Sequence, residues 1–408
     1  MTAVPVPMES PARWRALALI ALGELLGMSL WFSASAVSPA LKAEWSLTDT
    51  AAAWLTLAVQ LGFVAGTLAS AIGNLPDIVP TRRLFAVSAW LGAAANAGLA
   101  LFARGPAAAV VLRFLTGFFL AGVYPPGMKI MATWFRRGRG MALGVLVGAL
   151  TVGKAFPYLV NAVGGSSWRA NVLVVSVLGA AGGAIVLLFV GEGPHSARAA
   201  RFDVAQVAKV FGNRGVRLAD FGYFGHMWEL YAMWTWVPVF LRASFTAHGA
   251  GRSLAEAASF LVIGSGAAGC VAAGLLADRV GRTTVTSWAM AISGACCLGI
   301  GLLYDAPPAM LLAVCAVWGA AVVADSAQFS ACVTELADPR YMGTALTVQT
   351  CVGFLLTMGS IELVPLAAGA VGWRWAFAVL APGPILGVAA MLRLRGLPEA
   401  AQIAHGRR

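Results

Sequence analysis

Charged side chains are scarce in this chain of 408 residues. They make up 11% of it and hydrophobic residues make up 60%, whereas soluble proteins average about 25% and roughly 45–50%. A soluble domain of this size cannot bury so much apolar surface, so we expect most of the chain to lie in lipid. Basic residues outnumber acidic ones by 28 to 17. They gather in short loops, which indicates membrane topology and not a nucleic-acid partner.

The usual signatures of catalysis and of bound metal or nucleotide are also missing. The six cysteines lie in apolar segments of the second half without C-x-x-C or Cys/His metal spacing, so we expect them to be small packing residues. There is no G-x-S-x-G sequence, and the Gly140–Gly144–Gly148 ladder lacks the G-K-[ST] ending of a phosphate loop. Residues 1–12 lack the pattern of a cleaved signal peptide. The sequence therefore predicts no enzymatic activity, no cofactor and no metal.

Twelve apolar segments are long enough to cross a bilayer, which takes about 20 apolar residues. They are 16–37, 50–72, 84–103, 107–134, 141–163 and 170–191, then 218–241, 254–277, 285–304, 308–333, 344–368 and 375–392. Most connections are short, but 192–217 is a basic, mostly polar stretch. We therefore expect an all-α membrane protein with an N-terminal six-helix bundle (1–191), a cytoplasmic linker (192–217) and a C-terminal six-helix bundle (218–408).

Basic residues are distributed unevenly between the two sides of the expected membrane. With the amino terminus inside, the cytoplasmic segments hold nineteen lysine and arginine residues and the opposite side holds six. The six are Lys42, Arg104, Arg169, Arg242, Arg252 and Arg374. Because positive residues stay on the cytoplasmic side, we expect a multi-pass protein of the bacterial cytoplasmic (inner) membrane with both termini inside.

The same sequence signature occurs twice, about two hundred residues apart. The spacing E-L-x-x-M-x-x-W is found at 24–31 and 229–236, and G-x-x-x-D is found at 73–77 and 274–278. Matches at nearly one offset indicate two related halves joined in tandem. Two parallel repeats that face each other in a membrane are typical of a transporter with a central site.

The loop after the second span of each half resembles that of a known family. Residues 274–282 (Gly-Leu-Leu-Ala-Asp-Arg-Val-Gly-Arg) are similar to the G-x-L-a-D-r-x-G-R loop of the major facilitator superfamily, and Arg113-x-x-x-Gly117 resembles its R-x-x-x-G element. The copy at 73–83 keeps the glycine, the aspartate and a basic pair but has Pro80 where the family has glycine. The resemblance implies twelve transmembrane helices in two pseudo-symmetric six-helix bundles, secondary transport by alternating access, and a monomer.

These paired loops are candidates for a gate between the halves. An aspartate near the N-terminus of a neighbouring helix is stabilised by the helix dipole, and arginines pair with acids or reach lipid headgroups. A contact that links the halves in only one conformation suits a gate; the alternative is that the aspartates only cap helices and fix turns. The gating candidates are Asp77, Arg82, Asp278, Arg279 and Arg282.

Ionisable residues inside the spans are the candidates for proton coupling, because a charge at the bilayer centre costs roughly 2.5–3.5 kcal/mol. Glu24 and Glu229 lie near the middle of the first and seventh spans, which line the central cavity in the superfamily. His226 lies three residues before Glu229 on the same helical face, where a histidine can share the proton of a carboxylic acid. The alternative is that the glutamates only hold neighbouring helices together.

Lys154 in the fifth span is the most unusual cation of the chain. A buried ammonium needs a carboxylate or an anionic substrate, so we expect Glu24 or Glu229 as its partner, either permanently or until the substrate displaces it. Arg113 and Asp325 are further candidates in the fourth and tenth spans. The aromatic candidates for stacking on a substrate are Trp31, Tyr231 and Trp236.

Two classes of small-molecule substrate remain open. Proton-coupled uptake of a small organic or inorganic anion is favoured, because Lys154, Arg113 and Lys129 supply positive charge and residues 134–144 resemble the same region of nitrate and cyanate permeases. Nitrate itself is disfavoured, because nitrate carriers place an arginine in the second and eighth spans and 50–72 and 254–277 contain none.

The competing hypothesis is proton-driven export of a cationic or lipophilic compound, with Glu24 and Glu229 as counter-ions. Exporters of this kind carry a Gly-Pro pair in the fifth span, where this chain has Gly153-Lys154. A membrane sensor is disfavoured because no sizeable soluble domain is present.

Overall fold

The structure, a computed structural model, describes residues 11–135, 138–164, 167–195 and 202–407. All regular structure in these residues is helical. Five residues that count toward the expected cytoplasmic charge lie outside the described residues: Arg136, Arg137, Arg198, Arg201 and Arg408. The expected all-α fold is confirmed for the described chain.

The first half contains ten helical segments. They are α1 (Ala12–Met28), α2 (Ser33–Ala36), α3 (Ser38–Trp45), α4 (Asp49–Ile72), α5 (Leu75–Ile78), α6 (Thr81–Phe102), α7 (Pro106–Leu120), α8 (Tyr124–Trp134), α9 (Arg139–Gly164) and α10 (Trp168–Phe189).

The remaining segments run from the expected linker to the carboxyl end. They are η1 (Val204–Gln206), α11 (Val207–Gly212), α12 (Arg214–Ala247), α13 (Arg252–Gly264), α14 (Gly266–Val280), α15 (Arg282–Gly299), η2 (Ile300–Leu303), α16 (Pro308–Ala324), α17 (Ser326–Leu336), α18 (Met342–Val371), α19 (Trp373–Ala376), η3 (Phe377–Leu380), α20 (Pro382–Arg395) and η4 (Pro398–Gly406). Because α12 begins at Arg214, the last residues of the expected linker belong to the seventh span.

Ten of the described helices are long and apolar enough to cross a membrane. Three of these spans are bent pairs, α7 with α8, α13 with α14, and α16 with α17. The first and seventh positions are taken by α1, which has 17 residues, and by α12, which has 34 residues and carries Asp220, His226 and Glu229. The ten candidate spans together with α1 and α12 give the twelve transmembrane helices of the expected fold.

Several spans are interrupted where the sequence analysis expected continuous helices. The expected helix over 16–37 ends at Met28 and resumes at Ser33. The expected helix over 107–134 breaks at 121–123, directly before Pro125 and Pro126, because a proline ring clashes with the preceding helical turn. The tenth span breaks at Asp325, between α16 and α17. Each break frees backbone groups and redirects side chains in the middle of the membrane.

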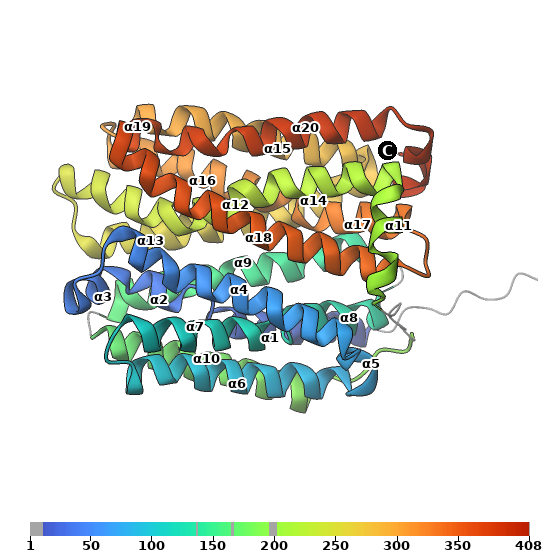
Figure 1. The fold of residues 1–408 in the computed structure, drawn as a ribbon, viewed down its shortest axis with the longest axis horizontal. Coiled ribbons are helices and arrows are strands. Elements are labelled where there is room, and N and C mark those ends of the chain that lie inside the picture. The colour runs from blue at the N-terminus through green and yellow to red at the C-terminus, as the bar shows by residue number, and fades with distance from the viewer. Residues whose placement is uncertain (1–10, 136–137, 165–166, 196–201, 408) are drawn as a thin grey trace, which may run out of the picture.

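The helices of the two halves form two groups that face each other (Figure 1). Within the first group α1 packs on α9 and α10, and α4 packs on α7; within the second, α12 packs on α18 and α20. Close approach is built in by glycine: a Cβ at Gly62 would lie 2.0 Å from the Phe114 carbonyl oxygen on α7. The groups meet where α9 packs on α13 and α14, and where α4 packs on α18.

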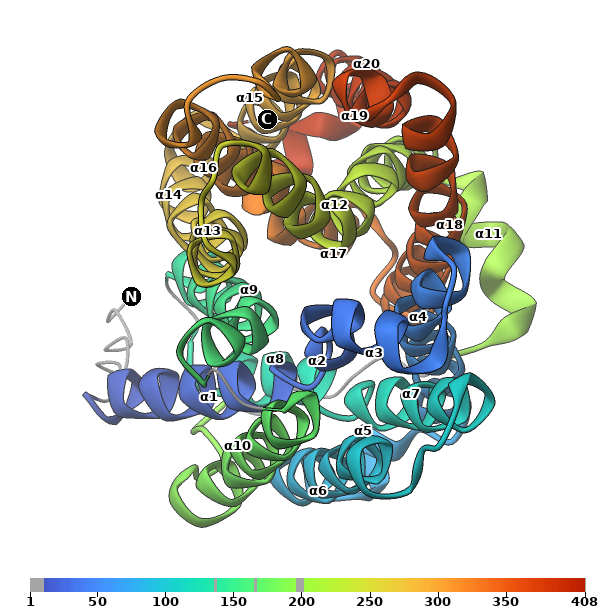
Figure 2. The ribbon, with the colours of Figure 1, turned by 90° about the vertical axis from the view of Figure 1, so that its left-hand side faces the viewer.

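The molecule has two distinct ends. The linker end carries α5, α11 and the carboxyl terminus, and the far end carries α3 and α19 (Figure 1). Viewed from the far end, α2, α4, α9, α12, α17 and α18 surround the middle of the molecule (Figure 2). The linker end is the one that the positive-inside count expects on the cytoplasmic side.

Candidate functional site

A central cavity of about 60 Å³ lies between the two halves. The turn between α1 and α2 contributes Trp31, and α9 contributes Lys154. The second half contributes Tyr231 and Trp234 from α12 and Phe354 from α18. Because both halves line this cavity, a molecule held in it contacts the two halves that move relative to each other in alternating access.

Lys154 is the cation of this cavity, and its side chain is 1% exposed. It donates a hydrogen bond to the Tyr231 hydroxyl, and its Nζ lies 4.2 Å from the ring centroid of Trp31 and 5.0 Å from that of Trp234. In the described part of the chain no carboxylate is close enough to form an ion pair with it. The expected ion pair with Glu24 or Glu229 is therefore absent in this conformation, and aromatic rings hold the ammonium by cation–π attraction.

Glu24 lies on α1, one turn before the helix ends, and is completely buried. Neither carboxyl oxygen has a hydrogen-bond partner among the described residues. The Lys154 charge acts on this carboxyl group, and a Cβ at Gly127 would lie 3.4 Å from Glu24 Oε2. Leaving a buried acid without a partner costs free energy, and Glu24 itself is not among the residues that line the central cavity.

Glu229 and His226 have separate partners, which corrects the expectation that they share a proton. The Glu229 carboxylate accepts hydrogen bonds from Ser293 (2.8 Å), Cys297 (3.1 Å) and Trp318 (2.6 Å), on α15 and α16. His226 Nδ1 instead lies 2.9 Å from Asp325 Oδ1, at the break between α16 and α17. Glu229 and Asp325 therefore both have their partners inside the second half, and neither of them lines the central cavity.

Other polar groups around the central cavity lack partners as well. The indole N–H groups of Trp31 and Trp234 are buried and, within the described residues, make no hydrogen bond. The side-chain nitrogen and oxygen of Gln60 are also buried without a hydrogen-bond partner among the described residues. Gln60 shares a face of α4 with Phe63, which lines the central cavity, because residues three apart lie on one side of a helix. The cavity thus offers hydrogen-bond donors that a ligand with oxygen acceptors would satisfy.

The aromatic cluster of the cavity consists of Trp31, Phe63, Tyr231, Trp234 and Phe354. Ring centroids are 4.6 Å apart for Phe63 and Phe354, 5.1 Å for Tyr231 and Phe354, and 5.5 Å for Trp31 and Tyr231. Sequence reasoning singled out Trp31 and Tyr231 but missed Gln60, Phe63, Trp234 and Phe354. For α4 the signal was present, since Thr56, Gln60 and Phe63 follow helical spacing. Nothing in the apolar pattern of α18 distinguishes Phe354.

Arg113 is fully buried on α7 and binds neutral acceptors. It donates to the backbone carbonyls of Leu30 (3.0 Å) and Trp31, which the break after α1 leaves free, and to Asn96 Oδ1 (2.9 Å). These bonds fix the turn that carries Trp31. Arg113 therefore holds the wall of the cavity in place and does not line it.

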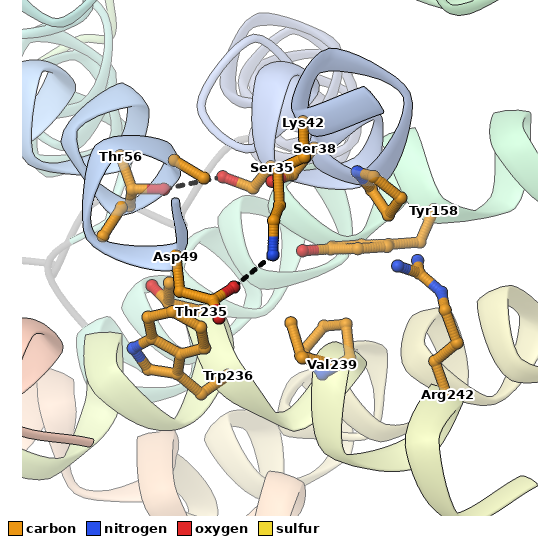
Figure 3. A pocket seen from close by; sticks show the side chains of 14 residues that line it. Ser35, Ser38, Lys42, Asp49, Thr56, Tyr158, Thr235, Trp236, Val239 and Arg242 are labelled. Carbon is orange, nitrogen blue, oxygen red and sulfur yellow. Dashed lines mark hydrogen bonds and ion pairs between the residues drawn. The ribbon is translucent and has the colours of Figure 1, made fainter. Parts of the chain in front are cut away.

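A larger outer cavity of about 320 Å³ is lined in part by residues of α3, the helix at the far end of the molecule (Figure 1). Figure 3 shows side chains of α12 facing those of α2, α3 and α4 across it. Its charged groups are paired, Lys42 with Asp49 and Arg242 with the buried Glu256. Trp236 lines this outer cavity and donates to the Ile361 carbonyl (2.8 Å). It does not line the central cavity, so the repeated Glu-Met-Trp face does not point to the same place in both halves.

The loop aspartates at the linker end differ in their contacts. A Cβ at Gly140, in the first turn of α9, would lie 3.1 Å from the Asp278 carboxylate oxygens, so this aspartate of the second half touches a helix of the first. Asp77 instead forms an ion pair with Lys129 of its own half. Arg282 pairs with Glu335 (2.8 Å) and donates to Gln328 (2.7 Å). Arg279 is exposed and Arg82 is half-buried.

Twelve transmembrane helices in two facing groups, with a central cavity between them, define a secondary transporter with a central site. The sequence model of the Major Facilitator Superfamily matches residues 19–361. The chain belongs to this superfamily, as its loop motifs predict. In the described residues no group of three or more His, Cys, Asp or Glu side chains is placed to bind a metal.

Comparisons with individual proteins show the fold alone. No curated protein matches this chain. Among solved structures, the proton:xylose symporter XylE bound to 6-bromo-6-deoxy-D-glucose is similar, with a TM-score of 0.74 and 13% sequence identity. The alignment covers 94% of this chain and 96% of that one. The protein is thus a multi-pass membrane transporter of small molecules whose substrate the fold leaves open.

Proposed function

We propose that this transporter takes up a small organic or inorganic anion together with protons. It acts as a monomer in the bacterial cytoplasmic membrane with both termini inside, and it moves its substrate without a chemical step. The observation that carries the proposal is the buried Lys154 ammonium, which has no carboxylate partner in the described structure.

Lys154 is the anion-binding group. A buried ammonium without a counter-ion is unfavourable, and the rings of Trp31 and Tyr231 compensate only part of its lost hydration. An anionic substrate completes the compensation by charge-assisted hydrogen bonds. The unpartnered N–H groups of Trp31 and Trp234 supply further donors.

Glu24 is the proton carrier. It is buried within the electrostatic reach of Lys154 and has no hydrogen-bond partner among the described residues. Once a substrate anion neutralises Lys154, an ionised Glu24 would add a second negative charge to an apolar site, so protonation of Glu24 and anion binding favour each other. The proton:xylose coupling named for XylE supports a proton-driven cycle on this fold.

The direction of transport is supported by the arrangement of the two ends. Neighbouring residues of α12 line both cavities, Thr235 and Trp236 the outer one and Tyr231 and Trp234 the central one. At the linker end α9 packs tightly on α14, with a Cβ at Gly144 reaching 2.7 Å from the Cys270 carbonyl oxygen. A state closed at the linker end is the one in which an importer would take up its substrate.

The second candidate function is proton-driven export of a lipophilic cation. The aromatic cluster favours it, since rings of this kind bind ligand cations. The Lys154 ammonium opposes it, because it already lies on the ring faces that such a cation would use. Export would require Glu24 to neutralise Lys154 and the substrate in turn.

The test is a thermal-shift measurement on the purified protein in detergent at several pH values. The ligands are acetate, benzoate, nitrate, cyanate and the lipophilic cation tetraphenylphosphonium. A ligand at a hundred times its Kd stabilises the protein by about 2.7 kcal/mol, and we expect this from at least one anion, more strongly at lower pH. Lys154→Gln should abolish the shift. Lys42→Gln, which removes an ammonium from the exposed Lys42–Asp49 pair of the outer cavity, is the matched control and should keep it.

Stabilisation by tetraphenylphosphonium alone, retained in Lys154→Gln, would replace uptake of an anion by export of a cation. Equal anion shifts in wild type and Lys154→Gln would remove Lys154 from the site.

A further inference from the structure

We infer that the substrate is a flat aromatic carboxylate, with its carboxylate on Lys154 and its ring in the aromatic cluster. The inference rests on the proposed function, because it needs an anion at Lys154. It goes further because it identifies the uncharged part of the substrate, a flat aromatic ring, as well as the charged group.

The Lys154 ammonium occupies a recess with three aromatic walls. Its Nζ lies 4.2 Å from the ring centroid of Trp31, 4.3 Å from that of Tyr231 and 5.0 Å from that of Trp234. When a carboxylate draws the ammonium away from these faces, the faces are left without a partner. In an aromatic carboxylate the ring begins one bond from the charged group, so the ring can fill the recess that the ammonium leaves.

The recess favours a ring over an aliphatic chain. Its walls continue into Phe354, whose centroid lies 5.6 Å from Trp31 and 5.1 Å from Tyr231. Ring pairs at such separations gain free energy beyond that of buried area, and a flat ligand can use several of them at once. The cavity is small, about 60 Å³ in this conformation, which favours a planar ring over a puckered ring of the same carbon number, because the planar ring takes up less volume.

The polar groups of the site match one carboxylate. Lys154 and the unpartnered indole N–H groups of Trp31 and Trp234 all donate hydrogen bonds. A carboxylate brings two acceptor oxygens and no donor. A lipophilic cation brings no acceptor, and a sugar brings as many donors as acceptors, so neither satisfies this set as fully.

The experiment measures the affinity of the purified full-length protein for benzoate, cyclohexanecarboxylate and acetate by calorimetry at low pH. Benzoate and cyclohexanecarboxylate carry the same charge and the same number of carbon atoms but differ in planarity. We expect benzoate to bind about tenfold more tightly than cyclohexanecarboxylate, with acetate weaker still. In Phe354→Leu the preference for benzoate should fall to about twofold, with the acetate affinity unchanged.

Equal affinity for the three carboxylates, or a preference for cyclohexanecarboxylate, would overturn the aromatic substrate and leave anion uptake standing. Absence of binding by all three and by the inorganic anions would remove the proposed function itself. If Phe354→Leu does not fold, Trp234→Leu replaces it, because Trp234 forms another wall of the recess. A preference for benzoate that neither variant changes would place the ring elsewhere and overturn the inference.

Discussion

Glu24 and Glu229 stand at equivalent places of the two repeats, yet their surroundings are opposite. Three donors from α15 and α16 satisfy the Glu229 carboxylate, whereas no described residue donates to Glu24. The two halves thus share a sequence signature and differ in what their neighbouring helices offer. The second half therefore surrounds its repeated glutamate with donors, and the first half offers its own glutamate none among the described residues.

The loop aspartates show the reverse asymmetry. Asp77 of the first half is satisfied within its own half by Lys129, whereas Asp278 of the second half lies against the first turn of α9 across the interface. The first half therefore carries the glutamate that has no partner among the described residues, and the second half carries the aspartate that touches the other half. In both comparisons, one copy of a repeated motif has its partners within its own half, and the other copy does not.

The largest effect should follow from exchanging each glutamate for its neutral isostere. Glu24→Gln removes the proposed proton carrier, so a pH gradient should no longer drive accumulation of benzoate in proteoliposomes. One proton that enters with one benzoate anion moves no net charge, so a pH difference of one unit supplies about 1.36 kcal/mol, which corresponds to about a tenfold accumulation ratio. Exchange of external for internal substrate should persist.

The same change at Glu229 is the control. Glu229→Gln should keep the accumulation ratio, because its carboxylate bonds only to groups of its own half. Loss of accumulation in Glu229→Gln together with normal accumulation in Glu24→Gln would reverse the roles that the contacts assign.

A smaller effect is expected from the loop aspartates. A charge near a helix terminus contributes about 0.3–1 kcal/mol, so Asp278→Asn should change the ratio of the two conformations by up to about fivefold. The measurement is the rate at which a cysteine placed at Ser38, in the outer cavity, reacts with a membrane-impermeant maleimide. The rate should fall in Asp278→Asn, because that variant weakens the contact that closes the linker end.

Asp77→Asn should leave this rate unchanged, because its partner Lys129 moves with it. Equal decreases in both variants would mean that the two loops gate alike, and unchanged rates in both would leave Asp278 with a structural role only.

The superfamily and the helical fold were predictable because their signals are local. Hydropathy marks the spans, and the loop at 274–282 can be read without knowing its neighbours. The site was only partly predictable. Lys154, Glu24, Trp31 and Tyr231 stand out as polar or aromatic residues in apolar spans, but their partners depend on how the helices face one another.

Helix breaks account for most of the difference between the expected and the observed site. The turn at 29–32 takes Trp31 off the regular face of α1, whereas α12 runs unbroken from Arg214 to Ala247. The two copies of the Glu-Met-Trp spacing therefore present their tryptophans to different cavities. Arg113 donates a hydrogen bond to the Trp31 carbonyl in this turn, although the two residues are 82 positions apart in the sequence. Helical spacing carries no information about such a distant contact.

A last contrast concerns two buried tryptophans, one in each half. Trp318→Phe removes the 2.6 Å hydrogen bond to Glu229 and should lower the free energy of unfolding by about 1.5–3 kcal/mol, the usual contribution of a hydrogen bond to a charged group. Trp31→Phe removes an N–H group that bonds to no described residue, so its unfolding free energy should change only through the lost ring area. Anion affinity should show the opposite order, falling in Trp31→Phe and staying unchanged in Trp318→Phe. Unfolding in detergent and calorimetry on the same two variants measure both quantities. Equal stability losses in the two variants would mean that the Trp31 N–H is satisfied in the protein, which would remove one donor from the substrate site and weaken the contrast between the halves.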